Sequence, residues 1–217
     1  MSVDIQNLRI EYPGQLVFDD VSLAVADDEI VAVRTEVLDG GTSLLKGIAG
    51  FLTGVAGKVM FEGYNLLEST PDEVRHLIGY VYETHGLVSI YSVFQNISLP
   101  LQFHTSLPGN EINTRVMEVC ELLGIAESQF ELRTHHLNDV QTRMVNLARA
   151  MVVNPKLLLI DEIEGGMSVD YLKDTMQALK QRQVKNPKAI IITTASEVVM
   201  EGADRVYVID NYNLVAA

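Results

Sequence analysis

Short apolar runs separated by helical patterns constrain the fold of this chain more than any other feature. The runs lie at residues 30–34, 78–82, 156–161, 189–194 and 206–209. Residues 157–160 are apolar at every position, a pattern typical of a strand that is buried on both faces. Because helical patterns alternate with these runs, the sequence predicts an α/β fold with a mostly parallel sheet.

The first part of the chain has a different strand pattern. Residues 5–12 and 21–26 have strand character, and Tyr12-Pro13-Gly14 is a turn signal between them. Residues 57–61 form a further strand. We therefore expect an antiparallel β part at the N-terminus, in front of the parallel sheet.

Apolar residues at helical spacing dominate the middle of the chain. They predict helices over residues 42–52, 92–99, 110–123, 141–153 and 171–185. Pro100 is expected to stop the second of these, because proline lacks an N–H and its ring clashes with the preceding turn. Residues 83–153 are then a helical subdomain within a single domain of residues 1–217, and residues 1–82 and 154–217 form its core.

Composition limits the classes of function. The 217 residues are 47% hydrophobic, enough for a sizeable core, and the net charge of −13 argues against a nucleic-acid partner. The single cysteine, Cys120, lies on the apolar side of a predicted helix and is expected to be a core residue in a reducing cytoplasm. A signal segment and a membrane-spanning apolar run are both absent from the sequence.

Residues 29–50 have the layout of a strand, a loop and a helix. At this place nucleotide-binding enzymes carry the phosphate loop G-x-x-x-x-G-K-[ST]. Residues 35–42 here are Thr-Glu-Val-Leu-Asp-Gly-Gly-Thr. Gly40 and the hydroxyl of Thr42 are kept, whereas Thr35 replaces the first glycine and Gly41 replaces the lysine. The sequence therefore predicts a degenerate phosphate loop, or Walker A motif.

The substituted loop should bind phosphate poorly. Such a loop works through backbone N–H groups, a helix N-terminus and one lysine. Glu36 and Asp39 add negative charge, and two like charges about 5 Å apart repel by about 3 kcal/mol at an effective dielectric constant of about 20. The alternative is that Arg34, at the end of the preceding strand, or Lys46 supplies the missing positive charge.

The order of motifs along the chain resembles the ATP-binding subunit of ABC transporters. The strongest likeness lies in residues 147–162, LARAMVVNPKLLLIDE, which resemble the signature helix of that family running into its Walker B strand. Tyr12 stands where the family stacks an aromatic residue on adenine. Glu83 stands where the family has a glutamine that coordinates Mg²⁺. The resemblance implies a P-loop NTPase (ABC ATPase) fold with a RecA-like core.

The Walker B residues match the family. The resemblance implies that Asp161 positions Mg²⁺ and that Glu162 polarises the attacking water. If nucleotide binds, the Mg²⁺ candidates are Asp161, Thr42 and Glu83. The implied nucleotide contacts are Tyr12, Arg34, Gly40, Gly41, Thr42 and Ser43, together with Asn138 and Gln141 of the signature.

Two other motifs depart from the family. The signature L-S-G-G-Q is Leu-Asn-Asp-Val-Gln at residues 137–141, where Asp139 repels phosphate and Val140 is bulky. Asn138 could still donate a hydrogen bond, and Asn138-Asp139 also suits the N-cap of a helix. Ala195 replaces the histidine that contacts the γ-phosphate, and Ser168 replaces an aspartate that crosses the dimer.

The losses fall on residues that act on phosphate or its metal, whereas the scaffold residues remain. This selectivity predicts a pseudo-ATPase in which Glu162 is idle and the cofactor is either none or weakly bound Mg-ATP. One alternative is an active ATPase that uses Arg34. Another is a soluble binding or regulatory module derived from such a subunit, since a fold does not fix a function.

The resemblance also implies partners. They are an integral-membrane permease and a second ABC ATPase subunit, in a homodimer or a heterodimer. The chain would then be cytoplasmic and lie at the cytoplasmic membrane face through the permease. The segment at residues 96–108, NISLPLQFHTSLP, resembles the Mla/Mce-type ATPases of bacterial lipid transport.

Overall fold

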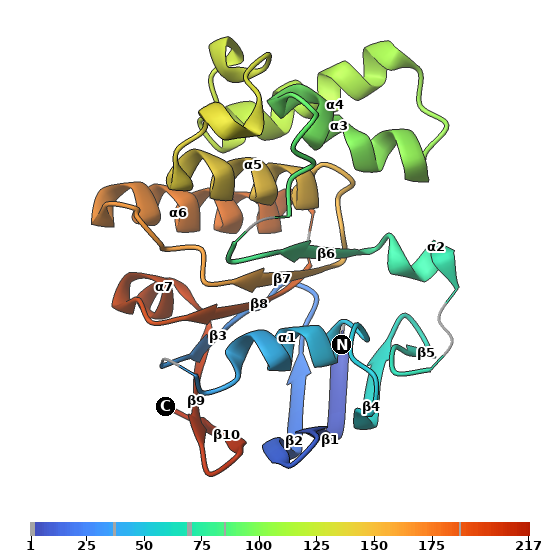
Figure 1. Cartoon of the computed structure of the whole chain (residues 1–217), viewed down its shortest axis with the longest axis vertical. Helices are drawn as coiled ribbons and strands as arrows, with labels where there is room; N and C mark the ends of the chain where they lie inside the picture. Colours follow the sequence, from blue (N-terminus) through green and yellow to red (C-terminus); the bar gives the residue numbers. More distant parts are fainter. Residues whose placement is uncertain (1–2, 37, 69–70, 85, 187) are drawn as a thin grey trace.

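Two β-sheets divide the strands of the chain between them (Figure 1). The computed structural model describes residues 3–36, 38–68, 71–84, 86–186 and 188–217. The antiparallel sheet has the strand order β2-β1-β4-β5. Its strands are β1 (Val3–Tyr12), β2 (Gln15–Val25), β4 (Ala56–Phe61) and β5 (Tyr64–Asn65). The antiparallel part predicted at the N-terminus is therefore confirmed.

The second sheet is parallel except at one edge. Its strand order is β10-β9-β3-β8-β7-β6. Its strands are β3 (Ile30–Arg34), β6 (Ile78–Val81), β7 (Leu157–Asp161), β8 (Ala189–Thr194), β9 (Arg205–Asp210) and β10 (Asn213–Ala216). Strand β10 forms an antiparallel hairpin with β9. The apolar runs of the sequence became the strands of this sheet, so the predicted α/β fold is confirmed.

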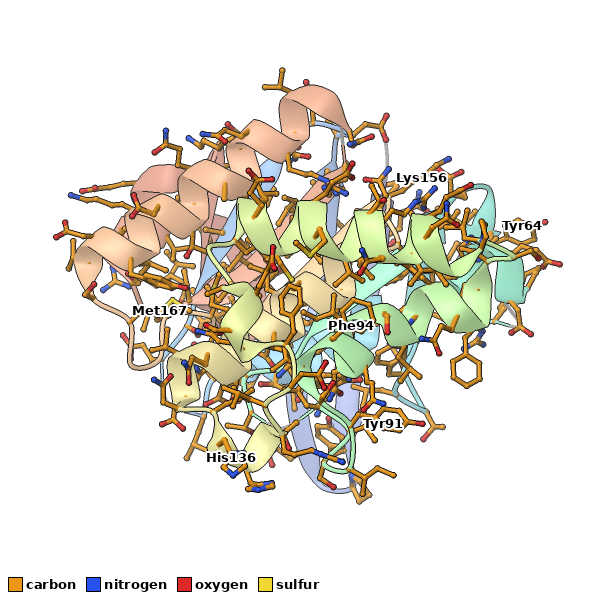
Figure 2. All side chains as sticks on the ribbon, turned by 90° about the horizontal axis from the view of Figure 1, so that it is seen from above. Tyr64, Tyr91, Phe94, His136, Lys156 and Met167 are labelled. Carbon is orange, nitrogen blue, oxygen red and sulfur yellow. The ribbon has the colours of Figure 1, made fainter. Side chains whose placement is uncertain are left out.

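Helices pack on both faces of the parallel sheet. They are α1 (Gly41–Ile48), α2 (Asp72–Arg75), α3 (Val93–His104), α4 (Gly109–Leu122), α5 (Asp139–Met151), α6 (Val169–Lys185) and α7 (Glu197–Gly202). Helix α1 shares one core with strands of both sheets, whereas α3 to α7 share the other core. Figure 2 views the molecule from the side of α3 and α4. On this side the rings of Phe94 and Phe130 pack against each other, with their centroids 6.0 Å apart. The division at residues 83–153 stays a prediction.

Alternate side chains of strand β7 point into these two cores. Leu158 and Ile160 pack with the helices α3 to α7, and Leu157 and Leu159 pack with α1 and the antiparallel sheet. All four side chains are fully buried. Since successive side chains of a strand point to opposite faces, and each buried side chain contributes about 1.5–3 kcal/mol, the register of β7 is fixed from both sides.

The second predicted helix does not stop at Pro100. Helix α3 continues to His104 with Pro100 inside it. A proline in a helix interior costs about 3 kcal/mol. However, Leu101, in the turn that follows Pro100, is fully buried, and its burial is worth about 1.5–3 kcal/mol. The hydroxyl and the N–H of Thr105 also both bond to the carbonyl of Leu101, at 2.6 Å and 3.0 Å. The predicted end at residue 99 was wrong because these contacts beyond the proline, together with the burial of Leu101, offset its local penalty.

Other boundaries moved for local reasons. Helix α1 ends at Ile48, short of the predicted residue 52, because Gly50 adopts a left-handed φ of 70°. The N–H of Phe51 then bonds to the carbonyl of Lys46 at 2.9 Å, which closes the helix end. Strand β2 begins at Gln15 rather than at residue 21, and α7 and β5 were not predicted.

Two expectations from composition concern burial and membrane spans. Cys120 is a buried core residue of α4, as predicted, and burial raises the pKa of its thiol to about 12. Within the described residues, every helix is too short or too polar to cross a lipid bilayer.

Candidate functional site

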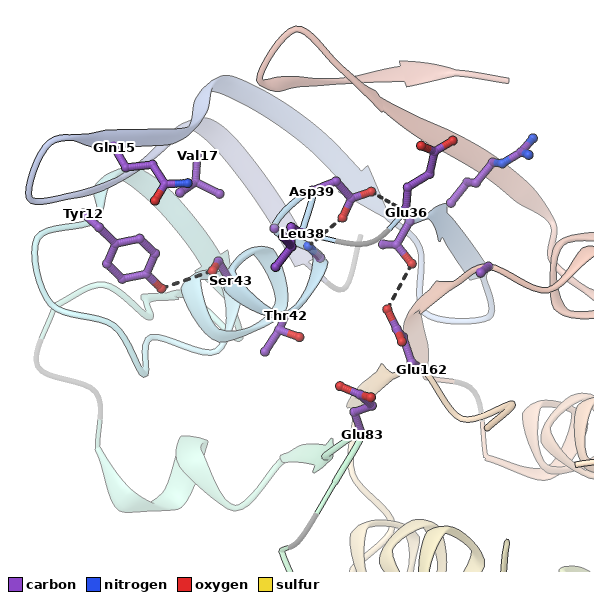
Figure 3. A pocket seen from close by; sticks show the side chains of 15 residues that line it. Tyr12, Gln15, Val17, Glu36, Leu38, Asp39, Thr42, Ser43, Glu83 and Glu162 are labelled. Carbon is purple, nitrogen blue, oxygen red and sulfur yellow. Dashed lines mark hydrogen bonds between the residues drawn. The ribbon is translucent and has the colours of Figure 1, made fainter. Parts of the chain in front are cut away.

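One cleft gathers most of the residues that the motifs single out (Figure 3). It has a volume of about 920 Å³ and lies at the C-terminal end of β3, where the chain leads into α1. Ligands of open α/β sheets bind at such carboxyl ends of strands. The predicted residues that line the cleft are Tyr12, Arg34, Gly40, Gly41, Thr42, Ser43, Glu83 and Glu162.

The carboxylate of Asp39 turns back onto its own loop. It accepts hydrogen bonds from the backbone N–H groups of Glu36, at 2.5 Å, and of Gly41, at 3.3 Å (Figure 3). Burial raises the pKa of Asp39, although the N–H donors oppose that shift. Val37, in the same loop, lies outside the described residues. Backbone amides that precede a helix suit an anion, and here an acidic side chain of the chain itself occupies two of them.

Gly41 and Thr35 are matched in shape. A Cβ atom built on Gly41 would lie 2.5 Å from Cγ2 of Thr35 and 3.2 Å from Cγ2 of Thr193. Carbon atoms pack best at about 3.5–4.0 Å, so any side chain at residue 41 would displace Thr35. The two departures from the phosphate-loop motif therefore depend on each other, because the methyl group of Thr35 takes the space that the β-carbon of a lysine would need.

The charges and bonds of these loop residues oppose the binding of a triphosphate. The lysine is absent, and two of the backbone donors already bond to Asp39. A phosphate oxygen about 4 Å from that carboxylate would be repelled by on the order of 4 kcal/mol per unit charge, at an effective dielectric constant of about 20. Glu36, Glu83 and Glu162 add further negative charge to the lining of the cleft.

The predicted metal ligands are only partly brought together. The hydroxyls of Thr42 and Thr193 donate to the same oxygen of Asp161, at 3.2 Å and 3.0 Å. Asp161 is buried, whereas Glu83 lines the open cleft. Oxygen ligands of this kind suit Mg²⁺. Nevertheless, the described part of the chain holds no group of three or more His, Cys, Asp or Glu side chains placed to hold a metal ion.

Glu162 is held in a strained and acidic position. Its backbone has a φ of 44°, which is uncommon for a residue with a side chain. Its N–H donates to the carbonyl of Thr193 at 3.1 Å, and its own carbonyl accepts from Arg143 at 2.7 Å. Burial raises the pKa of the Glu162 carboxyl, and the charges of Glu83, Glu164 and Asp161 raise it further. The hydroxyl of Thr35 donates to this carboxyl at 3.4 Å, so the first glycine of the motif has been replaced by a partner of Glu162.

Glu164 binds the segment where the family carries its histidine. One oxygen of Glu164 accepts from the hydroxyl of Thr194 and from the backbone N–H of Ala195, each at 2.7 Å. The other oxygen is buried without a hydrogen-bond partner in the described structure. Sequence reasoning missed this role, and the only available signal was an extra acid two residues after Glu162.

Arg34 and Lys46, the two possible replacements for the lysine, differ in whether they line the cleft. Arg34 is exposed at the end of β3 and lines the cleft, whereas Lys46 is not among the described residues around it. Tyr12 also lines the cleft, and its hydroxyl shares a hydrogen bond with that of Ser43 at 3.1 Å (Figure 3). Among the described residues that line the cleft, the candidate cation is therefore Arg34, on the side of β3.

The signature residues lie outside this cleft, as far as the described lining shows. Asn138 is the N-cap of α5, and its side chain accepts from the N–H of Gln141 at 2.8 Å. The side chain of Gln141 accepts in turn from the N–H of Asn138 at 2.9 Å. This reciprocal capping box explains both residues structurally. Asp139 and Arg143 line a separate, smaller cleft together with Glu83.

Comparison with known proteins identifies the family. The model of a family described as "ABC transporter" matches residues 18–164, which include the loop, α5 and β7. The chain belongs to the ABC transporter family. The resemblance predicted from the motifs is thereby confirmed.

Curated relatives of this chain belong to different transport systems. The methionine import ATP-binding protein MetN of Carboxydothermus hydrogenoformans is 34% identical over 97% of this chain. The chain spans 64% of the length of that relative. The tungstate uptake ATP-binding protein TupC of Peptoclostridium acidaminophilum is 31% identical, over 90% of this chain and 88% of its own. The intermembrane phospholipid transport protein MlaF of Haemophilus influenzae is 27% identical, over 99% and 82%.

Solved structures support the fold. The ATP-binding cassette MJ0796, in a dimer bound to ADP and Pi, has a TM-score of 0.89 at 20% identity, over 98% of this chain and 96% of its own. The protein cbiO1 of Clostridium perfringens, part of the complex cbiONQ, has a TM-score of 0.84 at 24% identity, over 98% and 86%. The predicted ABC ATPase fold is therefore confirmed.

Proposed function

We propose that this chain is a pseudo-ATPase subunit of an ABC transporter, which keeps the fold of the family but hydrolyses little or no ATP. The loop before α1 carries this proposal, because Gly41 replaces the lysine and the methyl group of Thr35 fills the space beside it. Ala195 has no side chain that could bond to a γ-phosphate. Glu162 would then be idle as a catalytic group, and Mg-ATP would bind weakly or not at all.

The proposed partners follow from the family. A subunit of this kind would dock to an integral-membrane permease at the cytoplasmic face of the membrane. It would also pair with a second ABC ATPase subunit, and in a heterodimer turnover would occur at the loop of the partner. The segment at residues 96–108 and the match to MlaF support a lipid cargo, whereas the matches to MetN and TupC support import of a small solute. We favour the lipid cargo on the strength of the segment.

Calorimetric titration with Mg-ATP and a phosphate-release assay test the proposal on nucleotide. An ABC subunit with intact motifs is the positive control. The Glu162→Gln variant is the matched negative control, because phosphate release that survives it comes from a contaminant. We expect no binding below millimolar ATP and no release that depends on Glu162. Micromolar affinity together with release abolished by Glu162→Gln would refute the pseudo-ATPase assignment.

One observation favours a second candidate, an active ATPase with an unusual loop. Arg34 lines the cleft and is exposed, so its side chain is accessible to a phosphate group. This candidate requires that Arg34→Ala abolish both the binding and the hydrolysis of Mg-ATP. If the wild-type chain neither binds nor hydrolyses ATP, the second candidate is excluded.

Affinity purification of the full chain from membranes solubilised in mild detergent tests the partners. We expect an integral-membrane permease to copurify, and mass spectrometry of that permease identifies the class of cargo. The second ABC ATPase subunit should appear in the same fraction. A chain that is recovered as a monomer, with neither a permease nor nucleotide, would instead favour the soluble binding module.

A further inference from the structure

The acidic residues around the cleft differ in the hydrogen-bond partners of their side chains. Glu36, Asp39, Glu83 and Glu162 all contribute to its lining. The carboxyl of Glu162 accepts a hydrogen bond from the hydroxyl of Thr35 at 3.4 Å. Among the described residues, Asp39 is the acid whose carboxylate accepts from backbone N–H groups of the loop itself.

The geometry of Asp39 is that of a bound anion. Its two oxygens bond to N–H groups that are five residues apart in sequence, those of Glu36 and Gly41, so the carboxylate bridges the two ends of the loop. Gly40, between them, has a φ of 97°, a left-handed conformation that favours glycine. Concave arrays of successive backbone N–H groups bind phosphate and other anions in many proteins. In this chain the anion is covalently attached.

The loss of the lysine and the presence of Asp39 have separate consequences. A missing lysine removes one favourable charge but leaves the backbone donors free for a weakly bound phosphate. A carboxylate that already occupies those donors competes with every incoming phosphate group at an effectively fixed local concentration. Removal of Asp39 should therefore restore anion binding even without a lysine, whereas removal of another acid of the loop should not.

We propose that Asp39 is the specificity-determining residue of this loop, a built-in anion that occupies the N–H groups of Glu36 and Gly41 and excludes phosphate from them. This inference rests on the proposed function and deepens it, because it names the side chain that keeps nucleotide out.

Titration of the full chain with pyrophosphate, in the absence of Mg²⁺, tests the inference. The variants are Asp39→Ala, which frees both N–H groups, and Asp39→Asn, which removes the charge but keeps an acceptor oxygen. Glu36→Gln is the matched control, since it removes the same charge from the same loop and leaves the bonds of Asp39 in place. We expect Asp39→Ala to bind pyrophosphate at least about tenfold more tightly than the wild type, with Asp39→Asn between them and Glu36→Gln close to the wild type.

Two results would overturn the inference. One is an unchanged affinity in folded Asp39→Ala and Asp39→Asn chains. The other is an equal gain in Glu36→Gln, which would mean that net charge, rather than occupation of the amides, controls binding. If Asp39→Ala does not fold, the test is the rate of amide hydrogen exchange of Glu36 and Gly41 in the Asp39→Asn chain. The inference requires both amides to exchange faster in that variant than in the wild type. Failure of the proposed function can be told apart from failure of this inference, because a wild-type chain that hydrolyses ATP would refute the proposed function.

Discussion

The contact between Gly41 and Thr35 predicts a strong coupling between the two positions. The Cβ atom added by Gly41→Ala would lie 2.5 Å from Cγ2 of Thr35, about 1 Å inside the preferred distance. Thr35 is 3% exposed, so its methyl group has little room to move. Overpacking of a buried site costs about 1–3 kcal/mol, and we expect Gly41→Ala to lower the free energy of unfolding by that amount.

The substitution Thr35→Ser removes the clashing methyl group and keeps the hydroxyl that donates to Glu162. Alone it should cost about 0.8 kcal/mol, the value of one buried methylene-sized group. In the double variant most of the penalty of Gly41→Ala should disappear, which gives a favourable coupling energy of about 1–2 kcal/mol. Part of the penalty should remain, because Cγ2 of Thr193 would still lie 3.2 Å from the new atom.

Urea denaturation followed by far-UV circular dichroism measures these energies, since the chain has no tryptophan to serve as a fluorescence probe. Gly109→Ala is the matched control, because a Cβ atom there meets nothing within 4 Å, and we expect it to be neutral or slightly stabilising. Effects of the two loop substitutions that add within about 0.5 kcal/mol would refute the steric argument. So would a Gly41→Ala chain that is as stable as the Gly109→Ala control.

Three further predictions concern stability. Burial and the charge of Arg182 lower the pKa of Lys188 to about 8, below its value in the unfolded chain. The unfolded state therefore binds more protons between pH 8 and about 10, and Lys188→Met should raise the free energy of unfolding by about 1–3 kcal/mol at pH 7 but by less at pH 10, as urea titrations at both values would show. The carboxyl of Glu162 changes the stability with pH in the opposite direction. Its pKa is raised, so its contribution to stability is present at acid pH and is lost as the pH rises through that raised pKa. Glu162→Gln should thus stabilise the chain at pH 7 by less than about 1 kcal/mol and flatten its stability between pH 4 and 7. Pro100→Ala should raise the stability by about 1–3 kcal/mol in thermal unfolding, because it restores a helical N–H inside α3.

Much of the fold could be predicted because the apolar sequences of the parallel strands fit a buried strand better than any other element. Four apolar residues in succession, as at 157–160, suit a strand covered on both faces, and the structure buries all four. Helix α7 could not be predicted in the same way, since it has six residues and buries only Val199 and Met200. Pro100 misled the prediction because a propensity describes one residue, whereas the packing of Leu101 belongs to the whole helix.

The site could be located from the sequence, but its contacts could not. The order of motifs placed Tyr12, Arg34 and Thr42 near one another, and they line one cleft. The bonds of Asp39 to its loop and of Glu164 to Ala195 depend on the direction of side chains in irregular segments, which spacing does not encode. The steric match of residues 35 and 41 needed atomic positions for the same reason.

The two cores that share strand β7 have a consequence for how the molecule loses its structure. Leu158 and Ile160 support one core, and Leu157 and Leu159 support the other, so opening either one uncovers half of the same strand. Neither half of the molecule can then melt without weakening its neighbour, and the chain should unfold as one cooperative unit. The amides of β7 and β8 are accordingly expected to exchange with solvent only through global opening, later than those of the antiparallel sheet.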